Sequence, residues 1–581
     1  MSQMSSTQHT QPPILEVKNL ETSFKTRHGW FKAVDDVSIS LYPGRTLCVV
    51  GESGSGKSVM SRSILQIVDA PGKITGGEIL LHTDFGDGAG HSTVNMIGMD
   101  PRGKQVRAIR GDDIAMIFQE PMSSLSPVHR IGDQIGETLR IHMGMSKKEA
   151  IARSVELLRM VEIPNPEEAV KRYPYEFSGG MRQRAMIAMA LSCNPKVLIA
   201  DEPTTALDVT IQAEILELMR SLQKAHNMAI LFITHDMGVV AEIADDVAVM
   251  RHGKVVEKGD VYSVFASPQH DYTKSLLHAA TQCEGPSDRR LAMRERRPLG
   301  DPILEAVALR KEYVITPAGF RREAKTLLAV KDANLQLRDG ENIGIVGESG
   351  SGKTTLARCI QRIHSVSSGA VLYTDRQGNT RDLAPLTKPD LKEPWRDMRI
   401  IFQDPFGSLN PRMTVGQIIA EPLMNHGLGT PVEQRARVAE LLDLVGLPGS
   451  AAERYPHAFS GGQRQRISIA RAIAPNPRII IADEATSALD VSLRTQIMDL
   501  LLELQEKLGL SYLFISHDVG LVRYFCDRVV VMYKGQIMEE GETEDVCTNP
   551  QHPYTQSLLS AVPIADPTMR ASKTRTRYVE G

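Results

Sequence analysis

Two glycine-rich stretches have the residue types and spacing that bind phosphate. Both have the pattern G-x-x-x-x-G-K-[ST], follow an apolar run and precede a segment that we predict to be helical. In that setting successive backbone N–H groups and the positive end of a helix surround one oxyanion. The expected phosphate-binding residues are Gly51, Glu52, Ser53, Gly54, Ser55, Gly56, Lys57 and Ser58, and in the second stretch Gly347, Glu348, Ser349, Gly350, Ser351, Gly352, Lys353 and Thr354. We expect the lysines to reach the β- and γ-phosphates of a nucleotide, and the Ser58 and Thr354 hydroxyls to bind Mg²⁺.

Two acidic pairs and two histidines could supply the other groups that phosphoryl transfer needs. Each pair ends an apolar run predicted to be a buried strand, and each histidine follows the next such run. These residues are Asp201, Glu202 and His235 in the first half and Asp483, Glu484 and His517 in the second. We expect each Asp to hold Mg²⁺, each Glu to accept a proton from the attacking water, and each His to donate to the γ-phosphate. An acidic pair could instead cap a helix, and a single histidine is more often structural, but their repetition favours catalytic roles.

The chain is an internal duplication. The acidic pairs, the histidines and the sequence Phe-Ser-Gly-Gly all recur at an offset of 282 residues. The offset is 296 between Lys57 and Lys353 but 284 between Gln119 and Gln403, so the first half carries 12 extra residues between these positions. We place them in residues 84–105, a stretch expected to form an enlarged hairpin tip.

The segments between the motifs predict the elements that position them. Residues 14–17 and 34–41 alternate like antiparallel strands, and residues 127–191 are expected to be mainly helical. Apolar runs predict buried strands at 47–50, 114–118, 197–200 and 229–233, and a helix is expected at 211–225. Strands that alternate with helices imply an α/β sheet with sites at the carboxyl ends of its strands.

Composition excludes several classes of protein. With 581 residues, 42% of them hydrophobic, the chain is expected to be globular with several domains. Its net charge of −3 argues against a nucleic-acid binder, and no apolar run reaches the roughly 18 residues of a membrane span. Residues 1–13 are expected to form a disordered tail. The six cysteines form no C-x-x-C pair, so we expect idle, buried thiols in a cytosolic protein.

Further motifs resemble those of ABC-type ATPases. They are the signature motif at residues 177–181 and 459–463, the D-loop at 205–208 and 487–490, the Q-loop glutamine at Gln119 and Gln403, and the switch histidine at His235 and His517. The resemblance covers residues 14–565. It implies two tandem P-loop NTPase domains, each with a RecA-like α/β core, an antiparallel β subdomain and an α-helical subdomain. It also implies catalytic and Mg²⁺-binding roles for Gln119 and Gln403.

In this family two ATPase units pair head to tail, and each ATP lies between one unit's phosphate loop and the other's signature motif. A Ser-Gly-Gly sequence at a helix start is itself an anion site. The resemblance assigns to ATP the signature residues Ser460, Gly461, Gly462 and Gln463 in the first site and Ser178, Gly179 and Gly180 in the second, with Phe24 and Tyr313 stacking on adenine. Both sites are expected to hydrolyse ATP, although Met181 replaces the family's usual glutamine and leaves their equivalence open. A core role for Phe24 is an alternative, because Trp30 and Phe31 lie close in sequence.

Other features resemble the oligopeptide/dipeptide/nickel importer family. The sequence Pro-Gln-His-x-Tyr-Thr-x-Ser-Leu-Leu at 268–277 and 550–559 resembles its C-terminal extension, and residues 118–125 and 402–411 resemble its Q-loops. The resemblance implies the ATP-hydrolysing subunit of an importer for di- or oligopeptides or for cargo of the glutathione class, peripheral on the cytoplasmic face of the bacterial inner membrane. The expected partners are two integral-membrane permease subunits, docking near the Q-loops, and an extracytoplasmic solute-binding protein, with one copy of this chain per transporter.

Two alternatives stay open. Twin ABC units without a membrane domain also occur in translation factors that act on the ribosome, but the junction at 284–300 is short and contains Pro and Gly. The cargo could also be a nickel chelate or another non-peptide.

Some related subunits carry an iron–sulfur cluster, which Cys283 alone cannot ligate.

The repeat sets the expected domain boundaries. They are 14–265 for the first ATPase domain, 266–283 for its extension, 284–300 for a linker, 301–547 for the second ATPase domain and 548–581 for its extension and tail. We expect the linker, which contains five arginines, to be a solvated segment of mixed charge. The same is expected of the basic tail after Pro563.

Overall fold

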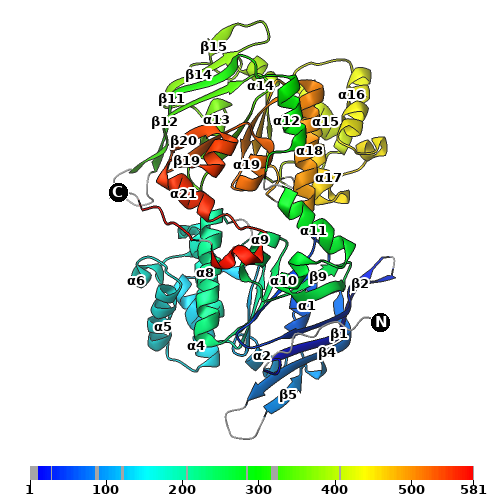
Figure 1. Ribbon diagram of the computed structural model, residues 1–581, viewed down its shortest axis with the longest axis vertical. Coiled ribbons are helices and arrows are strands. Elements are labelled where there is room, and N and C mark those ends of the chain that lie inside the picture. The colour runs from blue at the N-terminus through cyan, green and yellow to red at the C-terminus, as the bar shows by residue number, and fades with distance from the viewer. Residues whose placement is uncertain are drawn as a thin grey trace. The chain divides into compact units, whose positions relative to one another are not determined.

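The computed structural model describes residues 11–27, 29–84, 91–119, 124–204, 207–282, 285–315, 325–404, 407–487, 489–572 and 574–579 (Figure 1). The chain forms two compact units. Unit 1 contains Met1–Leu207, Ile211–Ala280 and Pro563–Lys573, and unit 2 contains Asp208–Thr210, Thr281–Val562 and Thr574–Gly581. Most of the expected N-terminal tail, part of each D-loop motif, part of each Q-loop segment and Cys283 lie outside the described residues.

Two sheets organise unit 1. The antiparallel sheet has the order β2-β1-β4-β5, with β1 Leu15–Thr26, β2 Gly29–Leu41, β4 Gly72–Asp84 and β5 His91–Asn95. The central sheet has the order β10-β9-β3-β8-β7-β6, with β10 Lys254–Asp260, β9 Asp246–Arg251, β3 Thr46–Val50, β8 Ala229–Thr234, β7 Val197–Asp201 and β6 Ile114–Ile117. Its pairs are parallel except β10 with β9. The α/β sheet is therefore confirmed, and the four predicted core strands agree with the structure to within one residue at each end.

The central strands are buried on both faces, which explains why their sequences are continuous apolar runs rather than alternating ones. Along β3, Leu47 and Val49 belong to the core shared with the antiparallel sheet. Cys48 and Val50 belong to the core shared with the helices. Packing on both sides fixes the strands, and with them the loops at their carboxyl ends.

Unit 1 also contains a series of helices. They are α1 Lys57–Ile64, α2 Lys104–Ile109, α4 Ile131–His142, α5 Lys147–Met160, α6 Pro166–Ala169, α7 Gly179–Ala190, α8 Val209–His226, α9 Met237–Ile243, α10 Val261–Ala266 and α11 Asp271–Gln282. Helices α4 to α7 confirm the helical region predicted at 127–191. Local signals start some of them: Ser146 accepts the N–H of Glu149, whose carboxylate accepts the N–H of Ser146 over 2.8 Å, a capping box at the start of α5.

Unit 2 repeats this architecture, which confirms the duplication. Its antiparallel sheet, β12-β11-β14-β15, consists of β12 Lys325–Arg338, β11 Pro302–Ile315, β14 Ser368–Thr374 and β15 Thr380–Asp382. Its central sheet, β16-β17-β18-β13-β19-β20, consists of β16 Met398–Ile401, β17 Ile479–Asp483, β18 Ser511–Ile515, β13 Asn342–Val346, β19 Arg528–Tyr533 and β20 Gln536–Glu542. The helices are α12 Asp288–Arg296, α13 Lys353–Ile360, α14 Lys392–Asp397, α15 Val415–Asn425, α16 Pro431–Leu444, α17 Gly461–Ile473, α18 Val491–Leu508, α19 Val519–Phe525, α20 Thr543–Thr548 and α21 Pro553–Ser560.

The extra residues of the first half lengthen a hairpin, as predicted. Strands β4 and β5 pair antiparallel and have 13 and 5 residues, whereas β14 and β15 in unit 2 have 7 and 3. The tip itself, residues 85–90, lies outside the described residues.

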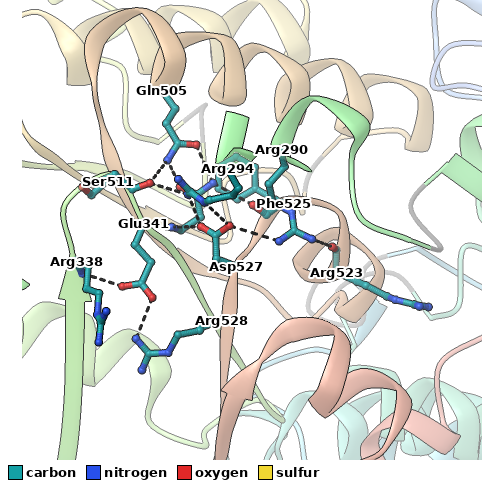
Figure 2. A network of polar contacts seen from close by, with 12 residues as sticks. Arg290, Arg294, Arg338, Glu341, Gln505, Ser511, Arg523, Phe525, Asp527 and Arg528 are labelled. Carbon is teal, nitrogen blue, oxygen red and sulfur yellow. Dashed lines mark hydrogen bonds and ion pairs between the residues drawn. The ribbon is translucent and has the colours of Figure 1, made fainter. Parts of the chain in front are cut away.

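The predicted solvated linker is instead largely a helix anchored to unit 2. Figure 2 shows Arg290 and Arg294 of α12 reaching Asp527, next to the start of β19. Arg294 Nε donates to Asp527 Oδ1 over 2.7 Å, and Arg290 lies 3.5 Å from the same oxygen. Met293, on the same helix, is 5% exposed and joins the unit 2 core. The expectation of a solvated, mixed-charge segment was wrong here because the arginines have a buried carboxylate partner about 230 residues away in the chain.

Part of the basic tail is also packed rather than solvated. Ser557 Oγ on α21 donates to the carbonyl of Thr576 over 2.8 Å. The Tyr578 ring lies 5.6 Å from the Tyr554 ring. The expectation for the tail was therefore wrong at these residues.

The prediction that the cysteines are buried is confirmed for four of the five thiols that the structure describes. Four are buried, Cys48, Cys193, Cys359 and Cys526, and Cys547 is half-buried. Burial raises the pKa of both Cys359 and Cys547 to about 11. These thiols therefore stay protonated at neutral pH.

Candidate functional site

The first phosphate loop connects β3 to α1. Gly56 precedes α1 with φ 103°, and a Cβ there would lie 2.4 Å from the Ala33 carbonyl oxygen, so only glycine fits. Lys57 Nζ donates to the carbonyls of Gly51 over 2.6 Å and Glu52 over 2.9 Å. Lys57 is 5% exposed, so its ammonium group is held inside the curled loop. A curled loop between a strand and a helix is what the sequence pattern predicts, and the contact of Lys57 with phosphate stays a prediction.

The second phosphate loop has the same geometry. Gly352 has φ 102°, and Lys353 Nζ donates to the carbonyls of Gly347 over 2.7 Å and Glu348 over 2.8 Å. Burial lowers the pKa of Lys353 below its ordinary value, and nearby carboxylates, including that of Glu484, partly oppose this shift. A low-dielectric site of this kind strengthens the attraction of the ammonium group for phosphate.

A hydroxyl and a carboxylate meet beside each loop. Ser58 Oγ donates to Asp201 Oδ1 over 3.0 Å, and Thr354 Oγ1 donates to Asp483 Oδ1 over 2.9 Å. Burial raises the pKa of both carboxyls, although the hydroxyl hydrogen bond opposes this in each case. Buried oxygen ligands next to a phosphate site are the donors that Mg²⁺ prefers, so these residues fit the ion.

Glu202 and Glu484 are held in an unusual backbone conformation. Their φ angles are 47° and 48°, in the left-handed region that non-glycine residues rarely adopt. The N–H of Glu202 donates to Ile233 O over 2.9 Å, and that of Glu484 donates to Ile515 O over 3.0 Å. Each glutamate is thereby fixed beside the strand that leads to the histidine of its own unit.

The predicted glutamine and histidine converge on each glutamate. Gln119 Nε2 donates to Glu202 Oε2 over 2.9 Å, and His235 Nδ1 lies 3.5 Å from Glu202 Oε1. The matching distances to Glu484 are 2.7 Å from Gln403 Nε2 and 3.4 Å from His517 Nδ1. Burial opposes ionisation of Glu484, but the hydrogen bond and charge of His517 and the charge of Lys353 hold its pKa below the ordinary value. The ionised carboxylate is the form that can accept a proton.

The signature motifs begin helices, as predicted, but differ between the units. Ser178 Oγ accepts the N–H of Met181 over 3.3 Å at the start of α7. Ser460 Oγ accepts the N–H of Gln463 at the start of α17, and Gln463 Oε1 also accepts the N–H of Ser460 over 3.1 Å. Only the second motif is therefore a full capping box, since methionine lacks the amide oxygen that accepts the second hydrogen bond there. Among the described residues, these hydrogen bonds of Ser178 and Ser460 are made within their own helices.

The two predicted adenine-stacking residues are both half-buried. Phe24 on β1 lies against Gly72, whereas Trp30 and Phe31 on β2 are 56% and 60% exposed. Tyr313 on β11 has the Lys311 ammonium group 4.9 Å from its ring centre. Their contact with adenine stays a prediction.

Two tyrosine hydroxyls on the phosphate loops were missed by the sequence reasoning. The N–H of Glu52 donates to Tyr272 Oη, and the N–H of Glu348 donates to Tyr554 Oη. The signal was present, because both tyrosines lie in the repeated Pro-Gln-His-x-Tyr-Thr sequence. It was used only to assign a family.

Each unit combines a curled phosphate loop and its lysine with a hydroxyl–carboxylate pair and a Glu-Gln-His cluster at the ends of parallel strands. Together these features define a phosphate-loop nucleoside triphosphatase, and the chain contains two of them. Comparison with known families narrows the class. The family described as ABC transporter matches residues 34–205 and 330–487, and the oligopeptide/dipeptide transporter C-terminal region matches residues 256–302 and 538–579. The chain belongs to the ABC transporter family, and it is an ATP-binding ATPase subunit.

Curated relatives match nearly the whole length of the chain. The glutathione import ATP-binding protein GsiA of Salmonella typhimurium is 47% identical over 575 residues, covering 95% of this chain and 90% of the relative. The protein of the same name from Escherichia coli K12 is 46% identical over 573 residues, with the same coverage. A solved ATP-binding cassette, a dimer in a post-hydrolysis state with ADP and phosphate, is 31% identical and covers 42% of this chain and 99% of its own, with a TM-score of 0.37.

Proposed function

We propose that this chain is the ATP-hydrolysing subunit of an importer for glutathione or short peptides. The observation that carries the proposal is the duplication of a complete Lys-Asp-Glu-Gln-His set together with the peptide-transporter extension in both halves. The names of the relatives support glutathione as the cargo. None of the helices in the described ranges is long and apolar enough to cross a membrane. The names of the family and of the relatives support the other parts of the proposal: integral-membrane permeases as partners, an extracytoplasmic binding protein, and a place on the cytoplasmic face of the inner membrane.

The proposed hydrolysis uses groups described above. The loop N–H groups and Lys57 would hold the phosphates, while Ser58 and Asp201 would hold Mg²⁺, which when bound neutralises phosphate charge. Glu202 would take the proton of the attacking water, and His235 would donate to the γ-phosphate. The second unit would use its matching residues. We propose that the units pair head to tail, so that each ATP also meets the other unit's signature motif.

A groove in unit 1 is our candidate for permease docking. It has a volume of about 500 Å³ and lies along α4, where Asp133, Thr138 and Arg140 line it. Ser126, a few residues after Gln119, also lines it. Its N–H donates to Gln134 Oε1 of α4 over 2.8 Å, which ties the chain after Gln119 to this helix. A permease bound in the groove would therefore contact the segment that follows Gln119 in the chain.

Filling this groove should uncouple the subunit from its permeases. We expect Thr138→Trp to weaken permease binding at least about tenfold, or ~1.4 kcal/mol, and to leave ATP hydrolysis by the isolated chain unchanged. Ala152→Trp, exposed on α5 outside the groove, is the matched control. Pull-down with detergent-solubilised permeases measures the effect. Equal binding by both variants and the wild type would exclude this groove as the docking site.

The cargo is tested by reconstitution with the permeases and binding protein in proteoliposomes. We expect glutathione or short peptides to stimulate ATP hydrolysis through the binding protein. Stimulation by nickel chelates alone would favour the non-peptide alternative. Co-purification of the chain with ribosomes and not with permeases would favour a translation factor, the remaining alternative from the sequence.

A further inference from the structure

The repeated sequence Pro-Gln-His-x-Tyr-Thr places a tyrosine hydroxyl on each phosphate loop. In unit 1 the backbone N–H of Glu52 donates to Tyr272 Oη over 2.9 Å. In unit 2 the N–H of Glu348 donates to Tyr554 Oη over 3.1 Å. Glu52 and Glu348 are the second residues of the two loops. The same contact is thus made twice, by residues more than 200 positions apart in the chain.

Three hydrogen bonds fix the turn that carries Tyr272. Glu257 on β10 accepts the N–H groups of Gln269 over 2.7 Å and His270 over 3.0 Å. His270 Nδ1 accepts the N–H of Tyr272 over 3.1 Å. Partial burial opposes ionisation of Glu257, but these N–H groups help to hold its pKa below the ordinary value. The charged carboxylate therefore ties the start of α11 to the central sheet at neutral pH.

The turn that carries Tyr554 is built in the same way. Glu539 on β20 accepts the N–H groups of Gln551 over 2.8 Å and His552 over 3.0 Å. His552 Nδ1 accepts the N–H of Tyr554 over 3.1 Å. The Pro-Gln-His part of the sequence therefore fixes the turn, and the turn positions the tyrosine beside the phosphate loop.

The tyrosine rings are also held in place, by burial and by packing against neighbouring side chains. Tyr272 is 6% exposed and Tyr554 is 1% exposed. The Arg251 guanidinium lies 4.8 Å from the centre of the Tyr272 ring, and the Tyr533 ring lies 4.5 Å from the Tyr554 ring. Arg251 and Tyr533 end equivalent strands, β9 and β19. Different side chains thus hold the two tyrosines in the same place.

The turns after these strands hold the loops at a second point. The N–H of Gly253 donates to Ser55 O over 2.9 Å, and the N–H of Gly535 donates to Ser351 O over 2.8 Å. The middle of each loop is therefore bound by its own central sheet. The start of the loop, at the second residue, is bound by the extension.

We propose that Tyr272 and Tyr554 are positioning residues through which the C-terminal extension sets the affinity of each phosphate loop for ATP. The inference rests on the proposed function, because it requires these loops to bind ATP. The hydroxyl acts on the nucleotide through the loop backbone. By fixing the direction in which the loop leaves its strand, it spares ATP the cost of ordering that residue on binding.

Removing only the hydroxyl tests the inference in the full chain. In Tyr272→Phe and Tyr554→Phe the ring keeps its packing while the loop N–H loses its acceptor. We expect Kd and KM for MgATP to rise about two- to tenfold, the effect of one hydrogen bond, with kcat changed less than about twofold. The rise in Tm that MgATP causes should shrink in both variants.

Tyr512→Phe is the matched control. Tyr512 on β18 is fully buried, and its hydroxyl donates to the Leu501 carbonyl over 3.0 Å rather than to a phosphate loop. It should lower Tm equally with and without MgATP and leave KM at the wild-type value. Tyrosine variants that behave like Tyr512→Phe would overturn the inference.

The wild type separates this inference from the proposed function. If the wild-type chain binds MgATP and the tyrosine variants bind it equally well, only the inference fails. If the wild-type chain does not bind MgATP at all, the proposed function fails and the inference fails with it.

Discussion

Exchanging Glu484 for glutamine is expected to slow ATP hydrolysis by about 10²- to 10⁴-fold, the usual contribution of a general base, and to leave ATP binding intact. The carboxylate accepts a hydrogen bond from Gln403 and pairs with His517, so an amide of the same size fits its place. The amide cannot accept a proton. Because its pKa lies below the ordinary 4.5, Glu484 is ionised throughout the neutral range, and this base is lost only as the pH falls below that value. Steady-state turnover and ATP-binding titrations measure the two effects.

The same substitution at Glu202 tests whether the two halves act together. We expect each single variant to lose most of the turnover, because we propose that the two sites hydrolyse ATP only together; two independent sites would instead leave about half of it. Glu503→Gln, on the exposed side of α18 where Glu503 pairs with Lys507, is a control that should hydrolyse ATP at the wild-type rate. Wild-type turnover in either single active-site variant would refute the symmetric two-site scheme.

Exchanging Asp527 for alanine should lower the stability of unit 2 by about 3–5 kcal/mol, the usual cost of removing one partner from a buried ion pair. Side-chain exposure is 6% for Asp527 and 7% for Arg290, so the arginine would keep a buried charge without its counter-ion. Asp527 also accepts the N–H of Asn342 over 2.9 Å at the start of β13, and this would be lost too. Calorimetric unfolding and hydrogen exchange of the α12 peptide measure the loss.

Unit 1 offers a matched control for this experiment. Asp245 accepts the N–H of Thr46 over 2.8 Å at the start of β3, the position equivalent to Asn342. It is half-buried. Asp245→Ala should therefore cost only about 1 kcal/mol, the value of one hydrogen bond. Equal losses in the two variants would show that the linker arginines contribute nothing to the stability of unit 2.

The sequence predicted the central strands and the positions of the candidate catalytic groups because both follow local rules. A strand buried on two faces is a continuous apolar run, and the residue after it lies at the sheet edge where Asp201 and Glu202 are found. The anchoring of α12 follows no local rule. Arg294 looks like a solvated residue until its partner Asp527 is known, and that partner is a long-range contact. The contact of the Tyr272 hydroxyl with the first phosphate loop was missed as well, because the repeat that contains Tyr272 does not show that its partner is Glu52, 220 residues earlier.

At Glu202 and at Glu484, the left-handed backbone lowers the stability of the fold while the side chain supplies the proposed catalytic base. A side chain there costs on the order of 1–3 kcal/mol that glycine would recover. Selection for heat resistance alone would therefore favour glycine at both positions, and the more stable protein would lack both proposed bases. Screens for robust variants of this subunit need turnover as a second criterion, because the most heat-resistant sequence would not be the working one.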